Sequence, residues 1–221
     1  MCGRYRLTQV ERIEHALEPE QMFGLSPRYN IAPSQLVPIV RQEDGRRILC
    51  MVRRGLVPFW AKDASIGYKM INARSETAIT KPAFRQCFRT RRCLIPADGF
   101  YEWVRLQPKK RPFHFGMKDG SLFAFAGLWD SWKSSDSAAV ESCTILTTTA
   151  NSLVDLHDRM PVILPRHHYE TWLAAQPSEA SRLVDLLVPF EADLMRRYEV
   201  SPLVNKPEND SPDCVAPVSA E

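Results

Sequence analysis

The sequence CLIPADGFYEWVRLQPKKRPFHFGMKDGSLFAFAGL, residues 93–128, alternates short apolar runs with turn residues. The runs are rich in β-branched or aromatic residues and are bounded by Gly, Pro or Asp, which is typical of strands. They cover residues 93–95, 99–104, 112–117 and 122–128. The pair Asp119-Gly120 predicts a hairpin turn between the last two runs. This part of the chain therefore predicts a largely antiparallel sheet.

The flanking sequence adds further strands and a few short helices. Strand-like runs recur at residues 36–41, 48–53 and 143–148. Helices are expected at residues 77–88, 151–156, 166–175 and 178–187. Thr8-x-x-Glu11 has the form of a capping box that opens one more short helix.

These elements show no regular alternation of strand and helix, no internal repeat and no long linker. They predict a single α+β domain whose largely antiparallel, barrel-like curled sheet is flanked by short helices. We expect the domain to span residues 1–210. Residues 211–221 contain Pro212 and Pro217 without an apolar pattern, which predicts a flexible C-terminal tail.

Composition is that of a compact intracellular protein. The 221 residues are 44% hydrophobic and 25% charged, enough for one domain with a sizeable core. Apolar runs are short, and the N-terminus lacks the order of a secretory signal, so we expect a cytoplasmic protein without membrane association. The six cysteines form no C-x-x-C pair and no zinc-finger spacing with histidine. We therefore expect reduced cysteines, no metal site and no cofactor.

The net charge of +3 hides an asymmetry along the chain. Residues 167–221 contain 10 acidic and 4 basic residues, whereas residues 1–166 contain 25 basic and 16 acidic ones. A single basic cluster is usually an ordinary solvated face. A whole segment of excess positive charge is better suited to a polyanion such as DNA, because summed charge and counterion release drive that binding.

Cys2 directly follows the initiator methionine. Removal of Met1 would leave one residue that carries both an α-amine and a thiol. Such a pair condenses with an aldehyde to an imine, and the thiol then closes onto the imine carbon as a thiazolidine. From its position alone, Cys2 is better interpreted as a small oxidisable residue near a frayed terminus.

Five segments change this interpretation, and they occur in a fixed order: MCGRY at residues 1–5, RYNIAP at 28–33, INARSET at 71–77, PADGFYEW at 96–103 and HDRMP at 157–161. Together they resemble the SOS response-associated peptidase (SRAP) family over about residues 2–165. The resemblance implies covalent capture of abasic sites in single-stranded DNA by the N-terminal cysteine. Such a DNA-protein cross-link would shield the damaged DNA during replication or repair, with association to the nucleoid upon damage.

The matched segments contain three further candidate catalytic residues. Glu102 lies between Tyr101 and Trp103, so partial desolvation would favour its neutral form and make it a proton shuttle for imine formation. The alternative is an edge-strand glutamate that faces water. His157 could assist opening of the sugar ring, because imidazole changes charge near neutral pH. Asn72 could orient the amine or a sugar hydroxyl, although asparagine alone more often forms turns.

Five residues are candidates for contacts with DNA. Arg4, Arg74 and Arg159 each lie near a proposed catalytic residue in the sequence and could hold the phosphates that flank the missing base. Phe59 and Trp60 could stack on an exposed base or act at a junction of single-stranded and double-stranded DNA. The alternatives are structural ion pairs for the arginines and core packing for the aromatic pair.

Two other functions remain open for the chain, which we expect to be a monomer. Cys2 could be the nucleophile of a peptidase, with its own amine as base, and one turnover of that activity would remove Met1. The chain could also be a non-covalent reader of single-stranded or modified DNA. Many relatives have Trp before Gly-Leu, whereas this chain has Arg54-Gly55-Leu56, and this departure affects the surface assigned to DNA.

Overall fold

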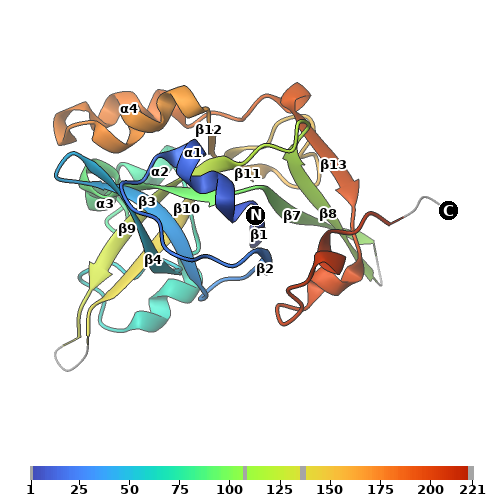
Figure 1. Cartoon of the computed structure of the whole chain (residues 1–221). Helices are drawn as coiled ribbons and strands as arrows, with labels where there is room; N and C mark the ends of the chain where they lie inside the picture. The colour runs from blue at the N-terminus through green and yellow to red at the C-terminus, as the bar shows by residue number, and fades with distance from the viewer. Residues whose placement is uncertain (1, 107–108, 135–137, 219–221) are drawn as a thin grey trace.

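The computed structural model describes residues 2–106, 109–134 and 138–218. A five-stranded antiparallel sheet contains the N-terminal strand next to its centre (Figure 1). Its order is β13 (Met195–Glu199), β8 (Lys109–Met117), β7 (Gly99–Leu106), β1 (Arg4–Leu7) and β2 (Arg28–Ile31).

A second, eight-stranded sheet curls around the core. Seven strands lie in the order β11 (Arg159–Pro161), β10 (Val140–Thr149), β4 (Arg46–Arg54), β3 (Leu36–Glu43), β6 (Arg92–Ala97), β9 (Phe123–Trp132) and β12 (Ile163–Leu164), and β5 (Asn72–Arg74) pairs with β10. β10 also pairs with β9, which brings β10, β4, β3, β6 and β9 into a ring. The parallel pairing of β4 with β10 joins only two residue pairs, so the ring is incomplete and the sheet is not a barrel. The predicted α+β class is confirmed.

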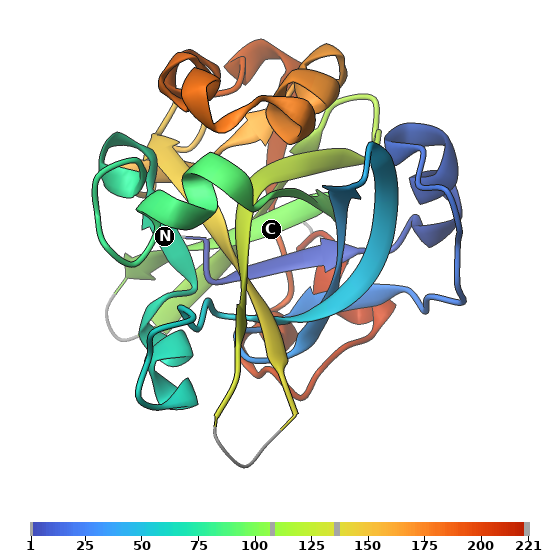
Figure 2. The same ribbon diagram turned by 90° about the vertical axis from the view of Figure 1, so that its left-hand side faces the viewer.

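Short helices cover the outside of the sheets (Figure 2). The α-helices are α1 (Ile13–Leu17), α2 (Ser75–Ala78), α3 (Arg85–Thr90) and α4 (Tyr169–Ala174). Seven 3-10 helices are described, at Val10–Arg12, Ala64–Lys69, Arg166–His168, Pro177–Leu186, Ala192–Leu194, Pro202–Asn205 and Pro212–Val215. None of these helices is long and apolar enough to cross a membrane.

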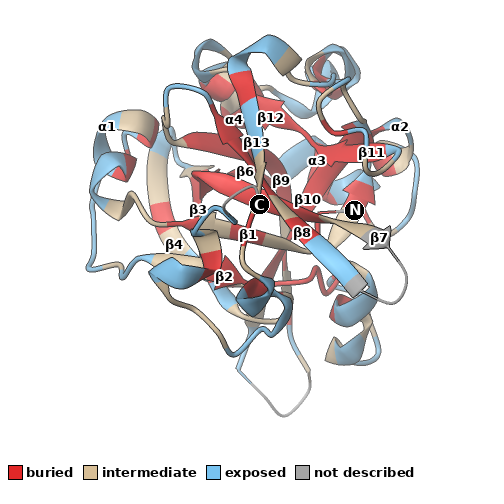
Figure 3. Cartoon of the chain, turned by 90° about the vertical axis from the view of Figure 1, so that its right-hand side faces the viewer, coloured by how far each residue is buried: buried red, intermediate tan, exposed pale blue. Residues whose placement is uncertain are grey.

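Aromatic packing joins the two sheets. Phe100 of β7 stacks on Phe115 of β8 with ring centroids 5.1 Å apart, and it meets Phe125 of β9 edge to face at 6.3 Å. Tyr5 of β1 contacts the same Phe125 at 5.7 Å. Such offset and edge-to-face pairs add to the stabilisation from burial. The buried strands in the centre of Figure 3 show where this core lies, and the helices around it are largely exposed.

The predictions of a capping box at Thr8 and of a hairpin turn at Asp119-Gly120 are wrong in their details. The helix after Thr8 begins without a side-chain cap of its own. Instead, Asp98 Oδ2, between β6 and β7, accepts hydrogen bonds from Thr8 N at 2.6 Å and Gln9 N at 2.8 Å. The turn at Asp119-Gly120 exists, but it connects β8 of one sheet to β9 of the other, so it closes no hairpin.

The helix predictions are confirmed only in part. Residues 166–175 are helical as expected, and residues 178–187 largely form a 3-10 helix. The predicted helix at residues 77–88 is interrupted between α2 and α3. Residues 151–156 form turns, because Asn151 Oδ1 accepts from the backbone N–H groups of Leu153 and Val154 and so competes with helical bonding.

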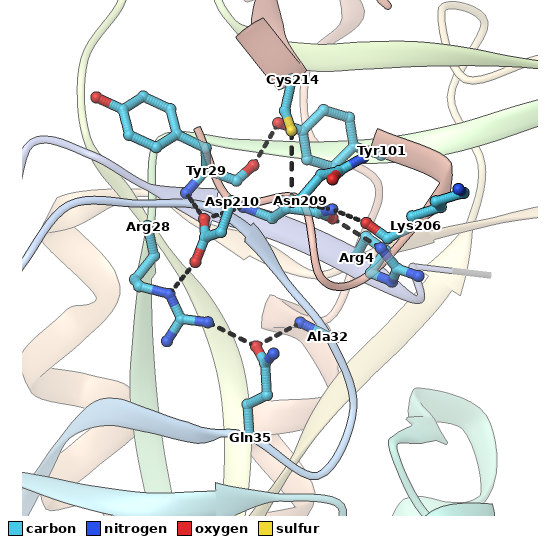
Figure 4. A network of polar contacts seen from close by, with 11 residues as sticks. Arg4, Arg28, Tyr29, Ala32, Gln35, Tyr101, Lys206, Asn209, Asp210 and Cys214 are labelled. Carbon is cyan, nitrogen blue, oxygen red and sulfur yellow. Dashed lines mark hydrogen bonds and ion pairs between the residues drawn. The ribbon is translucent and has the colours of Figure 1, made fainter. Parts of the chain in front are cut away.

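The C-terminal segment packs against β1 and β2 (Figure 4). Asp210 accepts from Tyr29 N at 2.5 Å and Asn30 N at 2.9 Å, and it pairs with Arg28. Within residues 211–218, Cys214 is fully buried and Val218 N donates to Glu199 O at 3.0 Å. This docking differs from the loose tail expected for residues 211–221, of which residues 219–221 lie outside the described part.

Candidate functional site

Cys2 lies inside the protein, at the point where β1 begins beside β7. Its exposed fraction is 0%. β1 pairs antiparallel with β7 so that Arg4 is opposite Tyr101. Continuing that register by one residue sets Gly3 opposite Glu102, which is 5% exposed. The sheet thus brings the N-terminal segment beside the buried carboxyl group.

Asn72 reaches Cys2 from the other sheet. β5 pairs in parallel with β10, with Asn72 opposite Ile145. Asn72 Nδ2 donates to the carbonyl oxygen of Cys2 at 3.2 Å. Its Oδ1 is buried and accepts no hydrogen bond from the described residues. This oxygen is therefore available to accept from a donor that enters the site.

Burial controls the charge of the Cys2 thiol and of the Glu102 carboxyl group. Desolvation raises the pKa of the Cys2 thiol to about 12, with the Arg54 charge acting in the opposite direction and Glu102 raising it further. Desolvation likewise raises the pKa of Glu102, while the charge of His157 lowers it. These effects require proximity, so they connect Cys2, Glu102 and His157 as one site. Burial favours a neutral thiol and a carboxyl group whose pKa lies closer to neutrality.

His157 lies at the edge of this site, in the loop before β11. Its Nδ1 is 2.5 Å from Asp158 Oδ1 and 3.2 Å from the backbone nitrogen of Arg159. Nδ1 donates to the carboxylate when it carries a proton and accepts from the backbone when it does not. Both contacts engage the same ring nitrogen, so Nε2 is the one left to meet a substrate.

The predicted DNA-binding arginines differ in what they contact. Arg159 is buried and binds Glu76 through two hydrogen bonds of 2.8 and 2.9 Å, and it also contacts Thr147. Its guanidinium is occupied within the fold. Arg74, at the end of β5 opposite Thr147, is exposed. The geometry therefore favours Arg74 over Arg159 for a contact with phosphate.

Arg4 holds the C-terminal segment. Its Nη1 donates to Asn30 Oδ1 at 2.8 Å and to Val204 O at 3.1 Å, and Nη2 is 3.5 Å from Asn205 O. The side chain is half-buried. Arg4 thus connects the N-terminal strand to the segment around Val204.

Phe59 and Trp60 are exposed at 57% and 47%. They follow β4 and line a surface depression together with Pro82 and Arg85. The buried carboxylate of Asp130 accepts from Phe59 N at 2.9 Å and so fixes the loop that presents the two rings. The alternative interpretation as core residues is wrong for both.

Sequence analysis did not assign a role to Arg54, the last residue of β4. It is 1% exposed and donates to the carbonyl oxygens of Gly3 and Cys2 at 2.7 and 2.8 Å. Gly55 follows with φ +115°, and a Cβ there would lie 2.5 Å from Gly67 O, so only glycine fits this turn. The sequence feature that could have indicated this buried position is an arginine that ends a partly apolar strand. The departure at this position therefore lies in the interior and not on the surface.

The gathered side chains supply a thiol, a carboxyl, an amide and an imidazole. Within the described part of the chain, this site included, no group of three or more His, Cys, Asp and Glu side chains could hold a metal ion. The arrangement is suited to nucleophilic attack coupled to proton transfer.

Comparisons with known proteins find a matching family model, similar sequences and a similar solved structure. The sequence model described as SOS response associated peptidase (SRAP) matches residues 1–207. The chain is 44% identical over 221 residues to the abasic site processing protein YoqW of Bacillus subtilis (strain 168), covering 97% of this chain and 99% of that protein. It is 29% identical to the abasic site processing protein HMCES of Rattus norvegicus, covering 86% of this chain and 65% of that protein. A crystal structure of a protein from Bacteroides thetaiotaomicron superposes with a TM-score of 0.86 at 27% identity, covering 98% of this chain and 100% of that one.

Proposed function

Because the chain belongs to the SOS response associated peptidase (SRAP) family, we propose that it captures abasic sites in single-stranded DNA through Cys2. Removal of Met1 would expose the aminothiol that performs the capture. Relatives named as abasic site processing proteins support the class of substrate. The observation that carries the proposal is the gathering of Asn72 and Glu102 around Cys2.

The reaction proceeds in two steps that balance without a cofactor. The α-amine of Cys2 adds to the aldehyde carbon of the open abasic sugar, and loss of one water gives an imine. The thiol sulfur then bonds to the imine carbon, and the thiol proton passes to the imine nitrogen. The product is a thiazolidine that joins protein and DNA, and nothing is oxidised or reduced.

Glu102 serves as the proton carrier in the first step. The α-ammonium must lose a proton, and the departing hydroxyl must gain one. A carboxyl group whose pKa is raised by burial is able to exchange protons closer to neutral pH than an exposed glutamate. Asn72 Oδ1 accepts from the α-amine of Cys2 or from a sugar hydroxyl.

His157 acts before this step, when the closed sugar must open to its aldehyde. Nδ1 is engaged by Asp158 and Arg159, which leaves Nε2 to donate a proton to the ring oxygen. Hydrogen bonds that orient one imidazole nitrogen commonly prepare the other for proton transfer.

The DNA strand follows the exposed groups near the site. Arg74 holds a phosphate next to the missing base, and Phe59 and Trp60 stack on neighbouring bases or at a junction. The basic balance of residues 1–166 attracts the strand as a whole.

Intact-mass measurement tests the proposal. Protein lacking Met1, mixed with single-stranded DNA that contains one abasic site, should give a denaturation-resistant product with the mass of protein plus DNA minus one water. Undamaged DNA of the same sequence is the control. Equal labelling of the abasic and the undamaged DNA, or no covalent product at all, would refute the capture mechanism. Salt-sensitive binding without a cross-link would favour the non-covalent reader.

The same spectra test removal of Met1. We propose that the chain removes this residue itself: the Cys2 thiol attacks the carbonyl carbon of Met1, the peptide C–N bond breaks and frees the Cys2 amine, and water then hydrolyses the thioester to release methionine and the thiol. Wild-type protein made in a cell-free system without aminopeptidase should lose the mass of one methionine, whereas Cys2→Ala should retain it. Retention in both would assign the removal to another enzyme.

A further inference from the structure

Arg54 is a buried cation placed against the backbone of the residue that carries the nucleophiles. Nη2 donates to Cys2 O at 2.8 Å and Nη1 donates to Gly3 O at 2.7 Å. Asn72 donates to the same Cys2 oxygen at 3.2 Å. The peptide group of Cys2 is therefore held by two strands of the eight-stranded sheet, β4 and β5.

Burial of this charge is costly for the fold. A guanidinium removed from water costs several kcal/mol unless partners compensate for it. Arg54 forms no salt bridge with a carboxylate of the described residues, and its Nε has no hydrogen-bond partner there. Besides the two carbonyls, it has the Tyr5 ring, 5.3 Å from its central carbon. Most of its compensation thus comes from the segment that holds Cys2.

Arg92 shows what a purely structural arginine does in this chain. It is also buried, and it donates to the carbonyls of Phe88, Arg89, Trp172 and Ala175 at the ends of α3 and α4. Those carbonyls are the unpaired acceptors of helix ends, so Arg92 satisfies the backbone. Arg54 faces no helix end. Its two acceptors lie in the N-terminal segment, beside the reacting atoms.

We propose that Arg54 is the positioning residue that holds the Cys2 aminothiol in its reactive geometry and supplies a fixed positive charge beside it. This inference rests on the proposed function. The charged and titratable groups that act on Cys2 are Arg54 of β4, Glu102 of β7 and the α-ammonium group of the N-terminus, with the Tyr5 hydroxyl of β1 near the same guanidinium. The Arg54 charge opposes the rise that burial and Glu102 impose on the pKa of the Cys2 thiol.

The test compares Arg54→Met and Arg54→Lys with Arg92→Met, a matched control in which another buried guanidinium, one that binds the ends of α3 and α4, is lost. Cross-linking rates on abasic single-stranded DNA are measured over a range of pH and divided by the folded fraction from thermal denaturation. Arg54→Met should be slower by about 10²-fold, because small displacements of a nucleophile have effects of that size. Its pH-rate profile should move to higher pH. Arg54→Lys should keep the profile near that of the wild type and recover part of the rate.

Arg92→Met should retain the wild-type rate per folded molecule and the wild-type profile. An unshifted profile in Arg54→Met, or a slowing shared with Arg92→Met, would overturn the proposal. Glyoxylate supplies a parallel readout without DNA, since this small aldehyde forms a thiazolidine with an accessible N-terminal cysteine. If glyoxylate capture depends on Arg54 but abasic DNA is not captured by the wild type, the proposed function fails and the role of Arg54 stands. If the wild type captures abasic DNA, and Arg54→Met captures both glyoxylate and abasic DNA at the wild-type rate, only the proposed role of Arg54 is wrong.

Discussion

Replacing Asn30 by alanine is expected to detach the C-terminal segment from β2. The Asn30 side chain is fully buried. Its Nδ2 faces the carbonyls of Val204, Lys206 and Asn209 at 3.2, 3.0 and 2.7 Å, and its Oδ1 accepts from Arg4 at 2.8 Å. Figure 4 shows the surrounding network.

The expected cost follows from these contacts. An amide nitrogen carries two hydrogens, so three carbonyls share two donors, and the Arg4 contact makes a third effective bond. At a net value of about 1 kcal/mol each, the loss is about 3 kcal/mol of the free energy of unfolding. Asn205→Ala is the matched control, because Asn205 lies in the same segment but is exposed, its side chain accepts from Trp103 Nε1 at 2.6 Å, and Arg4 contacts its backbone oxygen, which the substitution keeps. That control should cost at most about 1 kcal/mol.

Equilibrium urea unfolding of the three proteins measures the difference, and limited proteolysis reports whether residues 202–218 detach first. Asn30→Ala should expose this segment to cleavage under conditions that leave the wild type intact. A loss in free energy no larger than that of Asn205→Ala, with unchanged proteolysis, would show that the segment is not held by these contacts. It would also support the tail expected from the sequence.

Further outcomes are expected for Glu102, His157 and two of the arginines. Glu102→Gln should slow cross-linking by about 10²–10⁴-fold while DNA affinity is kept, as quenched time courses would show, and a native rate would exclude proton transfer by Glu102. Because burial raises the pKa of Glu102 in the folded state, the wild type should also lose stability relative to Glu102→Gln as pH rises from about 4, the ordinary value for a glutamate, through the raised pKa of the folded state, which thermal melts would measure. His157→Ala should be slow on the closed abasic sugar but near native on an analogue whose aldehyde is already open; equal slowing on both substrates would contradict a role in ring opening. Arg74→Ala should flatten the log-log salt dependence of DNA affinity by about 0.7, whereas Arg159→Ala should lower the melting temperature instead, since Glu76 and Thr147 occupy its guanidinium.

Local sequence patterns were sufficient to predict which residues form strands. They were insufficient to predict which strands pair with one another. The apolar runs at residues 93–95, 112–117 and 122–128 all lie within strands or overlap them, because side chains that alternate across a strand leave a pattern in the sequence. Which strands pair is a non-local property. The sequence Asp119-Gly120 therefore predicted a hairpin, although the turn connects β8 of one sheet to β9 of the other.

The same distinction applies to caps and helices. Thr8-x-x-Glu11 carries the letters of a capping box, but the acceptor that satisfies the backbone is Asp98, about ninety positions away. Asn151 prevents a helix because its side chain accepts two hydrogen bonds from backbone N–H groups two and three residues further along the chain. The first contact is invisible to a local pattern, and the second is a local competition that apolar spacing does not reveal.

The sequence by itself determined the α+β class and the family, and it indicated the chemistry proposed for the site, because a cysteine directly after Met1 and the ordered motifs require no contacts to be recognised. Only the tertiary structure decided which charged groups serve the site. Arg74, Arg159 and Arg54 are alike in sequence, yet one is exposed, one is occupied by Glu76, and one is buried against the Cys2 carbonyl. The physical reason is that a guanidinium behaves according to its solvation and its partners, and both are set by strands distant in the chain that β10 and β1 bring together.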